Sequence, residues 1–189
     1  PLAANAHRTE SLHRLAITDH LTGAYNRRYF YHFTDEILGR ARAERFRVTL
    51  LLYDIDDFKR YNDTYGHAVG DEILRETARL MRGVTRDHDV VARIGGDEFA
   101  VMFWDAEPPR RPDSQHPASA HELAERFRSA LAEYEFDCLG PDAKGTLTIS
   151  GGLASYPWDG ATCRDLLRAA DRALRAVKAD GKDGIRIVG

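Results

Sequence analysis

The alternation of apolar and polar positions along the chain predicts a succession of strands and helices. Residues 48–53 form a nearly continuous apolar run of strand length, which suits a central strand buried on both faces. Apolar residues at helical spacing follow this run, and residues 90–94 and 99–104 are then predicted as two further strands. A helix from about residue 121 and a strand over residues 146–150 complete this central part of the chain.

Further elements are predicted on both sides of this central part. Asn26 can accept a hydrogen bond from the first turn of a helix with one apolar stripe. Near the other end, Thr162 and Asp165 have the spacing of a capping box and predict the start of a last helix. Gly181 ends that helix, and residues 185–188 form a short closing strand.

The resulting order of strand, helix, two strands, helix and strand is that of a ferredoxin-like β-α-β-β-α-β core. We therefore predict an α/β (α+β) fold with a central mixed sheet covered by helices, a core that resembles the palm of nucleotide cyclases. Residues 105–118 are rich in proline and are predicted as a surface loop. The domain is expected to cover residues 19–189, preceded by a linker helix over residues 1–18.

Composition and charge restrict the class of protein. The chain has 189 residues, 43% of them hydrophobic and 30% charged, as is usual for a single globular domain in solution. Its net charge of −3 gives no general attraction to nucleic acid, so phosphate binding must come from local Lys and Arg side chains. No apolar run approaches the roughly 20 residues that span a bilayer, and no signal peptide is recognisable. We expect a cytoplasmic protein with no membrane insertion in this segment and no nucleic-acid partner.

The cysteines and histidines carry no metal-binding pattern. Cys138 and Cys163 match neither a metal-ligand spacing nor a disulfide-rich framework, which indicates a reducing compartment and two unreactive thiols. The eight histidines likewise lack a zinc-binding spacing.

Three carboxylates lie close together where the first apolar run ends. Asp54, Asp56 and Asp57 repel one another unless a cation or basic side chains compensate their charge. Alternatively, Asp56 or Asp57 caps the short helix that follows. The cluster alone leaves both interpretations open.

A second acidic pair follows a predicted hairpin turn. Gly95 and Gly96 stand between two predicted strands, and a type I′ turn requires positive φ at both central positions. Asp97 and Glu98 come directly after the turn. On its own, this pattern is also that of an ordinary acidic hairpin.

The two acidic groups together predict a metal site. A hairpin tip beside the end of a central strand brings Asp97 close to Asp54, and a backbone carbonyl near Ile55 can add a third oxygen. Mg²⁺ prefers such hard oxygen ligands and takes one or two protein carboxylates together with substrate phosphates.

These motifs resemble those of a known family. Residues 93–99, Arg-Ile-Gly-Gly-Asp-Glu-Phe, resemble the signature of the GGDEF-domain diguanylate cyclases. The resemblance covers about residues 19–188, because further motifs of the family are matched in the expected order by residues 19–28, 54–71, 150–152 and 171–182.

The resemblance implies a catalytic centre made of Asp54, Asp97 and Glu98. Asp54, Asp97 and the carbonyl of Ile55 would hold Mg²⁺, with Mn²⁺ as an alternative ion, and Glu98 would support the metal site. Asp97 is also the family's usual candidate for activating the attacking hydroxyl group.

The resemblance also implies how GTP is bound. Asn62 and Asp71 would recognise guanine, since a carboxylate can accept from both N1–H and the exocyclic amine, a pair of donors that adenine lacks. The other residues expected at the nucleotide, apart from three lysines, are Phe58, Gly95 and Gly96.

Those lysines, Lys59, Lys178 and Lys182, would contact the phosphates. A solvated helix surface is the alternative interpretation for any one of them. Lys182 departs from the family, which usually has arginine at this position, and lysine cannot make the bidentate contact of a guanidinium group.

An Arg-x-x-Asp pattern, Arg86 and Asp89, lies upstream of the signature. At this distance from the signature, the resemblance implies the family's inhibitory site for the product, cyclic di-GMP. The alternative is a pair of ordinary charges at the end of a helix.

The resemblance implies a diguanylate cyclase, which condenses two GTP molecules into cyclic di-GMP and releases pyrophosphate. Each domain would supply half of an active site, so a homodimer is expected for activity. In this family the helix before Asp19 connects to a sensory or receiver domain, and such a domain is expected upstream in the full-length protein.

Three other functions compete with this one. A degenerate nucleotide receptor would be expected to lack one of the catalytic carboxylates, and Asp54, Asp97 and Glu98 are all present. A purine nucleotide cyclase that acts on a single nucleotide shares the palm-like core, but the Gly-Gly-Asp-Glu-Phe hairpin and the Arg-x-x-Asp pattern argue against it. A dimerisation module leaves the acidic cluster without an explanation.

Overall fold

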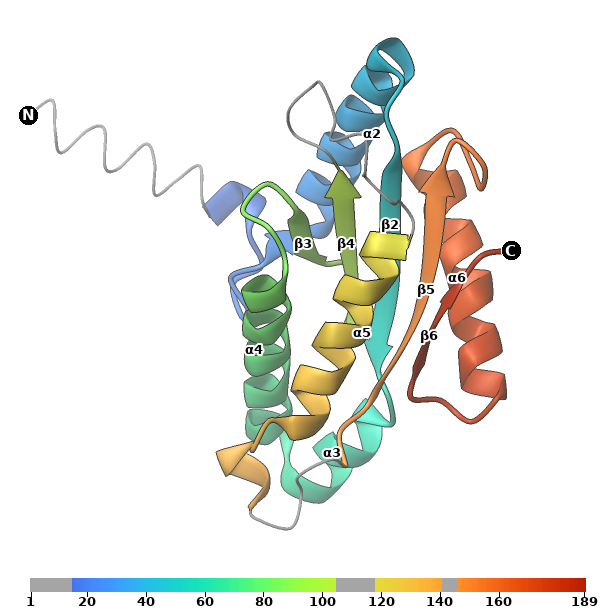
Figure 1. The fold of residues 1–189 in the computed structure, drawn as a ribbon. Coiled ribbons are helices and arrows are strands. Elements are labelled where there is room, and N and C mark those ends of the chain that lie inside the picture. The colour runs from blue at the N-terminus through green and yellow to red at the C-terminus, as the bar shows by residue number, and fades with distance from the viewer. Residues whose placement is uncertain (1–14, 105–117, 141–145) are drawn as a thin grey trace, which may run out of the picture.

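The computed structural model describes residues 15–104, 118–140 and 146–189 (Figure 1). Most of the expected linker helix and of the proline-rich loop lies outside these residues, although residues 15–17 are helical. The strands are β1 (Tyr25–Asn26), β2 (Val48–Ile55), β3 (Val90–Arg93), β4 (Glu98–Trp104), β5 (Ile149–Tyr156) and β6 (Gly184–Ile187). The α-helices are α2 (Arg27–Glu44), α3 (Phe58–Tyr65), α4 (His67–Val84), α5 (Ala118–Glu133) and α6 (Cys163–Ala179), and Asp137–Leu139 form a 3₁₀ turn.

The six strands form one mixed sheet in the order β1-β3-β4-β2-β5-β6. The four inner strands pair antiparallel, and the two outer strands pair parallel with their neighbours. Because β2, β3, β4 and β5 are connected through helices and one hairpin in ferredoxin-like order, the predicted β-α-β-β-α-β core is confirmed.

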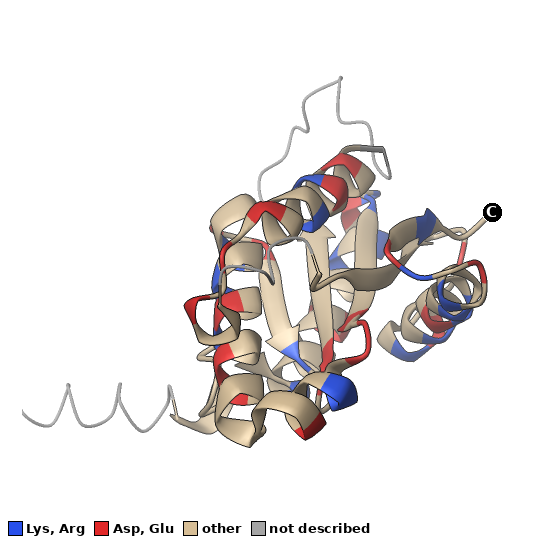
Figure 2. Ribbon diagram, turned by 90° about the horizontal axis from the view of Figure 1, so that it is seen from below, with Lys and Arg blue, Asp and Glu red and all other residues tan. Residues whose placement is uncertain are grey.

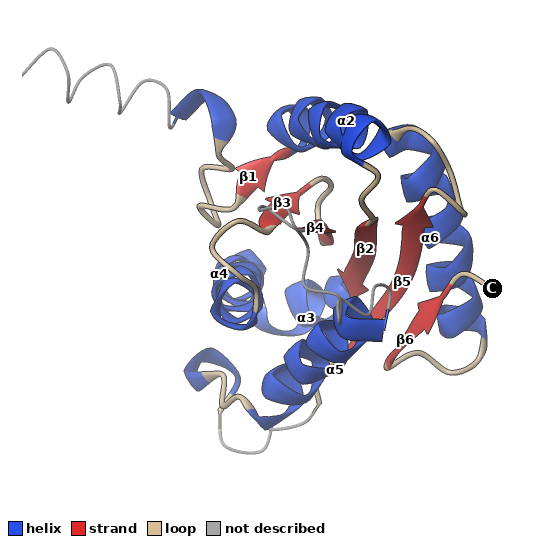
Figure 3. Cartoon of the chain, turned by 45° about the horizontal axis from the view of Figure 1, so that its top comes forward, coloured by secondary structure: helices blue, strands red, loops and turns tan. Residues whose placement is uncertain are grey.

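Helices cover both faces of this sheet (Figure 3). On one face α2 and α6 pack in a core with Phe30, Leu50 and Met102, and on the other α3, α4 and α5 pack around Tyr53 and Phe99. Every residue of β2 is buried, as expected for a central strand with helices on both sides. Lys, Arg, Asp and Glu residues are interspersed along the helices in Figure 2.

Both predicted helix starts are confirmed. The side chain of Asn26 accepts a hydrogen bond from the backbone N–H of Tyr29 at 2.9 Å, at the start of α2. The hydroxyl of Thr162 accepts from the backbone N–H of Asp165 at 3.2 Å and donates to its carboxylate at 2.8 Å. These local contacts satisfy groups that a helix start leaves without partners.

The structure corrects three predicted boundaries. β2 continues to Ile55, so Asp54 lies within the strand and not after it. α5 begins at Ala118, before residue 121. β5 begins at Ile149 and passes through Gly151 and Gly152, which do not end it.

The two glycines of β5 allow close packing. A Cβ atom at Gly152 would lie 2.0 Å from the carbonyl oxygen of Ala170 on α6, so only glycine allows the helix to approach the strand this closely. At Gly151 the space of a side chain is taken by Ile185 of β6, whose Cδ1 would lie 2.7 Å from an added Cβ.

The predicted hairpin between β3 and β4 is confirmed, but the prediction of a type I′ turn is wrong. Neither Gly95 nor Gly96 has a positive φ. Instead, the backbone N–H groups of Ile94 and Gly95 both donate to the carbonyl of Glu98, at 2.9 and 3.2 Å. The turn is therefore wider than a two-residue turn, and its tip includes Asp97.

Neither cysteine forms a disulfide. Burial, together with the smaller effect of the Asp35 charge, raises the pKa of the Cys163 thiol to about 12, so this thiol stays protonated. In the part of the chain that the structure describes, no helix is both long and apolar enough to cross a membrane.

Candidate active site

The candidate site begins at the end of the central strand. Asp54, next to last in β2, is directly opposite Glu98 of β4 on one side and Ser150 of β5 on the other. The antiparallel register therefore places Glu98, the first residue of β4, beside the acidic end of β2. The ends of β2 and α6, together with α3, meet at the lower edge of the sheet in Figure 1.

Asp54 is a buried carboxylate that is only partly satisfied. Only 7% of its side chain is exposed, and its Oδ2 accepts a hydrogen bond from Nζ of Lys178 on α6. Its Oδ1 is buried and accepts no hydrogen bond from any described residue. Burial raises the pKa of Asp54 to about 6, since the contact with Lys178 lowers it by less than burial raises it.

Asp97 and Glu98 occupy different places around Asp54. The charge of Asp97 also raises the pKa of Asp54, so the two carboxylates interact as expected. The Glu98 carboxylate lies against the hairpin backbone, because a Cβ atom at Gly95 would be 2.5 Å from its Oε2. Gly95 thus leaves room for this side chain.

The acidic groups do not form a complete metal cage by themselves. Across residues 15–104, 118–140 and 146–189, no three His, Cys, Asp or Glu side chains gather in a metal-binding cluster. The unsatisfied Oδ1 of Asp54 nevertheless fits a hard cation, since such an ion would supply the missing partner. Mg²⁺ commonly takes few protein carboxylates and completes its shell with water and phosphate oxygens.

The capping interpretation of the other two aspartates is wrong. Asp57 occupies the N-cap position of α3 with a left-handed φ of 55°, but its side chain makes no capping hydrogen bond. Asp56 accepts from the hydroxyls of Ser150 at 2.7 Å and Thr148 at 2.8 Å, and from the backbone N–H of Asp183 at 3.1 Å. Asp56 therefore ties β2 to β5 and to the turn after α6.

Two of the lysines predicted at the phosphates contact carboxylates here. Lys178 donates to Asp54, and Nζ of Lys182 donates to Oδ1 of Asp57 at 2.7 Å. Lys59 is exposed on α3. Since α6 ends beside the end of β2, the cations and the acidic cluster share one small region.

The residues predicted at guanine converge between α3 and α4. A Cβ atom at Gly70 would lie 1.9 Å from Oδ1 of Asn62 and 3.3 Å from Cζ of Phe58. The Asn62 amide thus rests directly on the backbone of Gly70, and Asp71 follows on the same helix, half-buried. Gly70 was matched to the family motif, but its steric role is visible only in the structure.

Arg86 and Asp89 line a separate cleft. The volume of this cleft is about 570 Å³, and Ile17, Thr18 and Arg82 also line it. Asp89 is buried, and its Oδ2 accepts from the backbone N–H of Arg86 at 2.9 Å, which closes the turn after α4. Its Oδ1 is buried, accepts no hydrogen bond from a described residue and lies 3.8 Å from Nε2 of His88.

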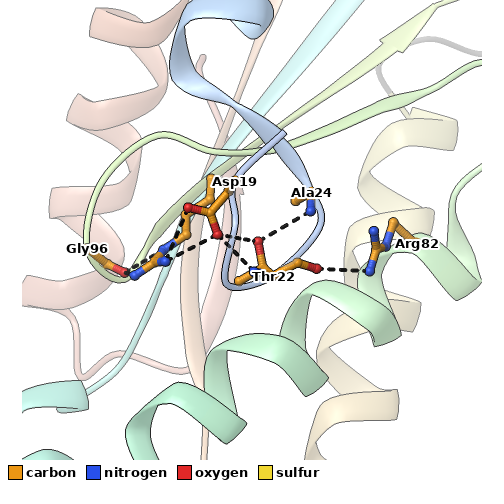
Figure 4. A network of polar contacts seen from close by, with 6 residues as sticks. Asp19, Thr22, Ala24, Arg82 and Gly96 are labelled. Carbon is orange, nitrogen blue, oxygen red and sulfur yellow. Dashed lines mark hydrogen bonds and ion pairs between the residues drawn. The ribbon is translucent and has the colours of Figure 1, made fainter. Parts of the chain in front are cut away.

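A polar network that the sequence analysis did not identify joins the N-terminal turn to the hairpin (Figure 4). The guanidinium of Arg93 donates to the carbonyl of Gly96 at 2.7 and 3.0 Å and contacts Asp19 at 3.3 Å. Asp19 in turn accepts from the backbone and the hydroxyl of Thr22, at 2.9 and 2.8 Å.

The same N-terminal turn is held from α4. Arg82 donates to the carbonyls of Gly23 and Thr22 at 2.9 and 3.2 Å. Motif membership was the only sequence signal for these contacts, since Asp19 and Arg93 are far apart in the chain.

Comparison with known proteins places the chain in one family. A family model described as "Diguanylate cyclase, GGDEF domain" matches residues 16–184. The chain is 37% identical over 171 residues to the response regulator PleD of Caulobacter vibrioides, covering 90% of this chain and 36% of that protein. It is 33% identical to diguanylate cyclase A of Treponema denticola, covering 98% of this chain and 48% of the relative. The chain thus spans less than half the length of these two relatives.

A solved structure has the same fold. The coiled coil and GGDEF domain of DgcB from Caulobacter crescentus, in complex with c-di-GMP, superposes with a TM-score of 0.83 at 27% identity. The match covers 98% of this chain and 93% of that one.

Proposed function

Because this chain belongs to the GGDEF-domain diguanylate cyclase family, we propose that it condenses two molecules of GTP into cyclic di-GMP. The 3′-hydroxyl oxygen of each GTP attacks the α-phosphorus of the other, two P–O bonds form, and two pyrophosphates leave. The single observation that carries this proposal is Asp54, a buried carboxylate beside Asp97 with one oxygen unsatisfied.

Asp54, Asp97 and the carbonyl of Ile55 would hold Mg²⁺ or Mn²⁺, with Glu98 supporting them. When bound, the ion supplies positive charge that favours the ionised hydroxyl and stabilises the leaving pyrophosphate. Asp97 lies on the hairpin tip, where it can accept the proton of the attacking hydroxyl. Arg93 fixes this tip through the carbonyl of Gly96.

Guanine recognition is assigned to the place where α3 packs on α4, at Asn62 and Gly70. Asn62 and Asp71 present a carbonyl, an amide and a carboxylate toward one base, and the Asp71 carboxylate matches the two donors of guanine. Phe58 borders Asn62 and can contact the base. Lys59, Lys178 and Lys182 bind the phosphates, with Gly95 and Gly96 allowing the hairpin backbone to come close.

The active species is a homodimer, since one domain binds one GTP and the reaction needs two in opposite orientation. Product inhibition is assigned to the cleft at Arg86 and Asp89. A guanidinium can contact phosphate or the guanine edge, and Oδ1 of Asp89 remains available as an acceptor. The full-length protein would carry a sensory or receiver domain upstream and act in the cytoplasm.

Product analysis tests the activity. The purified chain is incubated with GTP and Mg²⁺ over a range of protein concentrations, and the nucleotides are separated. Cyclic di-GMP and pyrophosphate are expected, with specific activity that rises with protein concentration. A cyclic mononucleotide as the product would identify a single-substrate cyclase instead, and concentration-independent specific activity would contradict the dimer.

A further inference from the structure

Two lysines near the end of α6 lie on acidic side chains of the site. The ammonium of Lys178 contacts Oδ2 of Asp54, and the ammonium of Lys182 contacts Oδ1 of Asp57 at 2.7 Å. The side chain of Lys178 is 41% exposed, whereas that of Asp54 is 7% exposed. Lys178 therefore reaches from solvent onto a buried carboxylate.

The backbone that carries these lysines is fixed on two sides. Lys182 and Asp183 have left-handed φ values of 69° and 48°, which is unusual for residues other than glycine. The backbone N–H of Asp183 donates to Asp56, and Arg128 on α5 contacts the Asp183 carboxylate at 2.9 Å. The turn is thus held in place, while the long lysine side chains can change partners.

If a metal ion binds Asp54, the ammonium group of Lys178 has to leave this carboxylate, because two cations would otherwise lie side by side. A buried carboxylate needs a positive partner, and Lys178 is the one that contacts Asp54. A divalent cation on Asp54 would stand beside this ammonium group and be repelled by it. A nucleotide brings phosphate oxygens, which can accept the ammonium group at the moment the cation replaces it.

We propose that Lys178 is a placeholder cation, which neutralises Asp54 before substrate binds and moves to the nucleotide phosphates when the metal ion arrives. This inference rests on the metal site of the proposed function and extends it to the order of binding. Metal alone competes with Lys178 and binds poorly. Metal and nucleotide together bind well, because each removes the obstacle to the other.

Metal binding without turnover tests this exchange. The affinity of Mn²⁺ for the nucleotide-free chain is measured by electron paramagnetic resonance of the free ion. Lys178→Met is expected to bind Mn²⁺ at least about tenfold more tightly than wild type, because the competing charge is gone.

Arg175→Met is the matched control. Arg175 is one turn earlier on α6, is 77% exposed and pairs with Asp171 at 2.9 Å. Its removal changes the net charge equally without touching Asp54, so its Mn²⁺ affinity should stay within about twofold of wild type. If both variants bound Mn²⁺ more tightly by the same factor, the change in net charge alone would explain the effect, and the proposal would be overturned.

Adding 3′-deoxy-GTP, which lacks the attacking hydroxyl, measures the coupling. This nucleotide should strengthen Mn²⁺ binding in wild type by a larger factor than in Lys178→Met. Asp54→Asn distinguishes the placeholder role of Lys178 from the metal site of the proposed function. Loss of Mn²⁺ binding in Asp54→Asn, with no tightening in Lys178→Met, would refute the placeholder and leave the proposed function intact. Unchanged Mn²⁺ binding in Asp54→Asn would refute the metal site itself.

A second measurement needs only the wild-type protein. Acetylation of Lys178, followed by mass spectrometry, reports whether the Lys178 ammonium group still contacts Asp54. Exposed Lys59 is the reference for the step with Mn²⁺ alone, before nucleotide is added. Saturating Mn²⁺ alone should accelerate acetylation of Lys178, and added 3′-deoxy-GTP should slow it again. No change on adding Mn²⁺ would contradict the exchange, whether or not Lys178→Met folds.

Discussion

Asp19 and Asp54 are two aspartates beside a basic side chain, but their surroundings differ. Asp19, in the N-terminal turn, accepts from Thr22 at 2.8 and 2.9 Å and contacts Arg93 at 3.3 Å. Burial alone would raise the pKa of Asp19, yet these hydrogen bonds and the charge of Arg93 lower it. Asp54 has a raised pKa of about 6, chiefly from burial, and one oxygen without a partner.

We interpret the difference as that between a structural carboxylate, Asp19, and the proposed metal ligand, Asp54. Asp19 is stabilised by the fold as an anion, so it strengthens the folded state. Ionised Asp54 is disfavoured by burial, so its charge weakens the folded state at neutral pH, a cost that the proposed metal ion would offset. Both reach the same hairpin, Asp19 through Arg93 and Asp54 through Asp97.

The largest expected effect is on catalysis. Asp54→Asn and Asp97→Asn should each lower the rate of cyclic di-GMP formation by at least about 10³-fold, because each removes a charge from the proposed metal site. Asp63→Asn, on an exposed carboxylate of α3, serves as the control and should keep near wild-type turnover. Near-normal turnover in either site variant would remove that residue from the metal site.

The second effect is on stability and has the opposite sign to the usual one for a buried residue. The unfolded carboxyl titrates near 3.8 and the folded Asp54 near 6, so wild-type stability falls as the pH rises between these values. Asp54→Asn should therefore be more stable than wild type by about 2–3 kcal/mol at pH 7.5 and nearly equal to it at pH 3.5. Urea unfolding at both pH values gives the difference, and a less stable variant at pH 7.5 would contradict the assigned burial cost.

The corresponding substitution at Asp19 should lower the free energy of unfolding, whereas Asp54→Asn should raise it. Asp19→Asn should lose about 1–2 kcal/mol at pH 7.5, because the charged contact with Arg93 is removed. Since the pKa of Asp19 is lowered by folding, this contribution is present at neutral pH and is lost as the pH falls below about 4. Urea unfolding at the same two pH values measures this loss. If Asp19→Asn were more stable than wild type at pH 7.5, the two aspartates would not differ in their effect on stability.

A smaller effect is expected on substrate affinity. Gly70→Ala places a methyl group against Asn62, so GTP binding should weaken by about tenfold, or about 1.4 kcal/mol. Gly39→Ala is the control, since a Cβ at Gly39 on α2 meets nothing within 4 Å. Calorimetry with 3′-deoxy-GTP measures both, and an unchanged affinity in Gly70→Ala would separate Asn62 from guanine recognition.

The sequence predicted the features that depend on short-range pattern. The buried run of β2, the Asn26 and Thr162 caps, and the hairpin strands follow from periodicity and local hydrogen bonding. Two glycine pairs were misjudged. Gly95 and Gly96 have no positive φ and form a wider turn. Gly151 and Gly152 lie inside β5 and allow close packing of β6 and α6, which are distant in sequence. The left-handed turn at Lys182 and Asp183 has no glycine at either position to indicate it.

The site was predicted less completely than the fold, for a similar reason. Motifs predicted roles for Asp54, Asp97, Asn62 and Asp71, which stay predictions, and the register of β2 against β4 places Glu98 beside Asp54. The partners of Asp56, Lys178 and Lys182 depend on where α6 ends relative to β2. Spacing along the chain contains no information about that contact.

The position of a bound metal ion decides whether Asp54 is a metal ligand and whether Lys178 gives way to the ion. Crystals grown with Mn²⁺ and 3′-deoxy-GTP allow the ion to be located by its anomalous scattering. We expect a peak within direct coordination distance of Oδ1 of Asp54, beside Asp97, with Lys178 moved from Asp54 to a phosphate oxygen. A peak elsewhere in the molecule, with Lys178 still bound to Asp54, would contradict it.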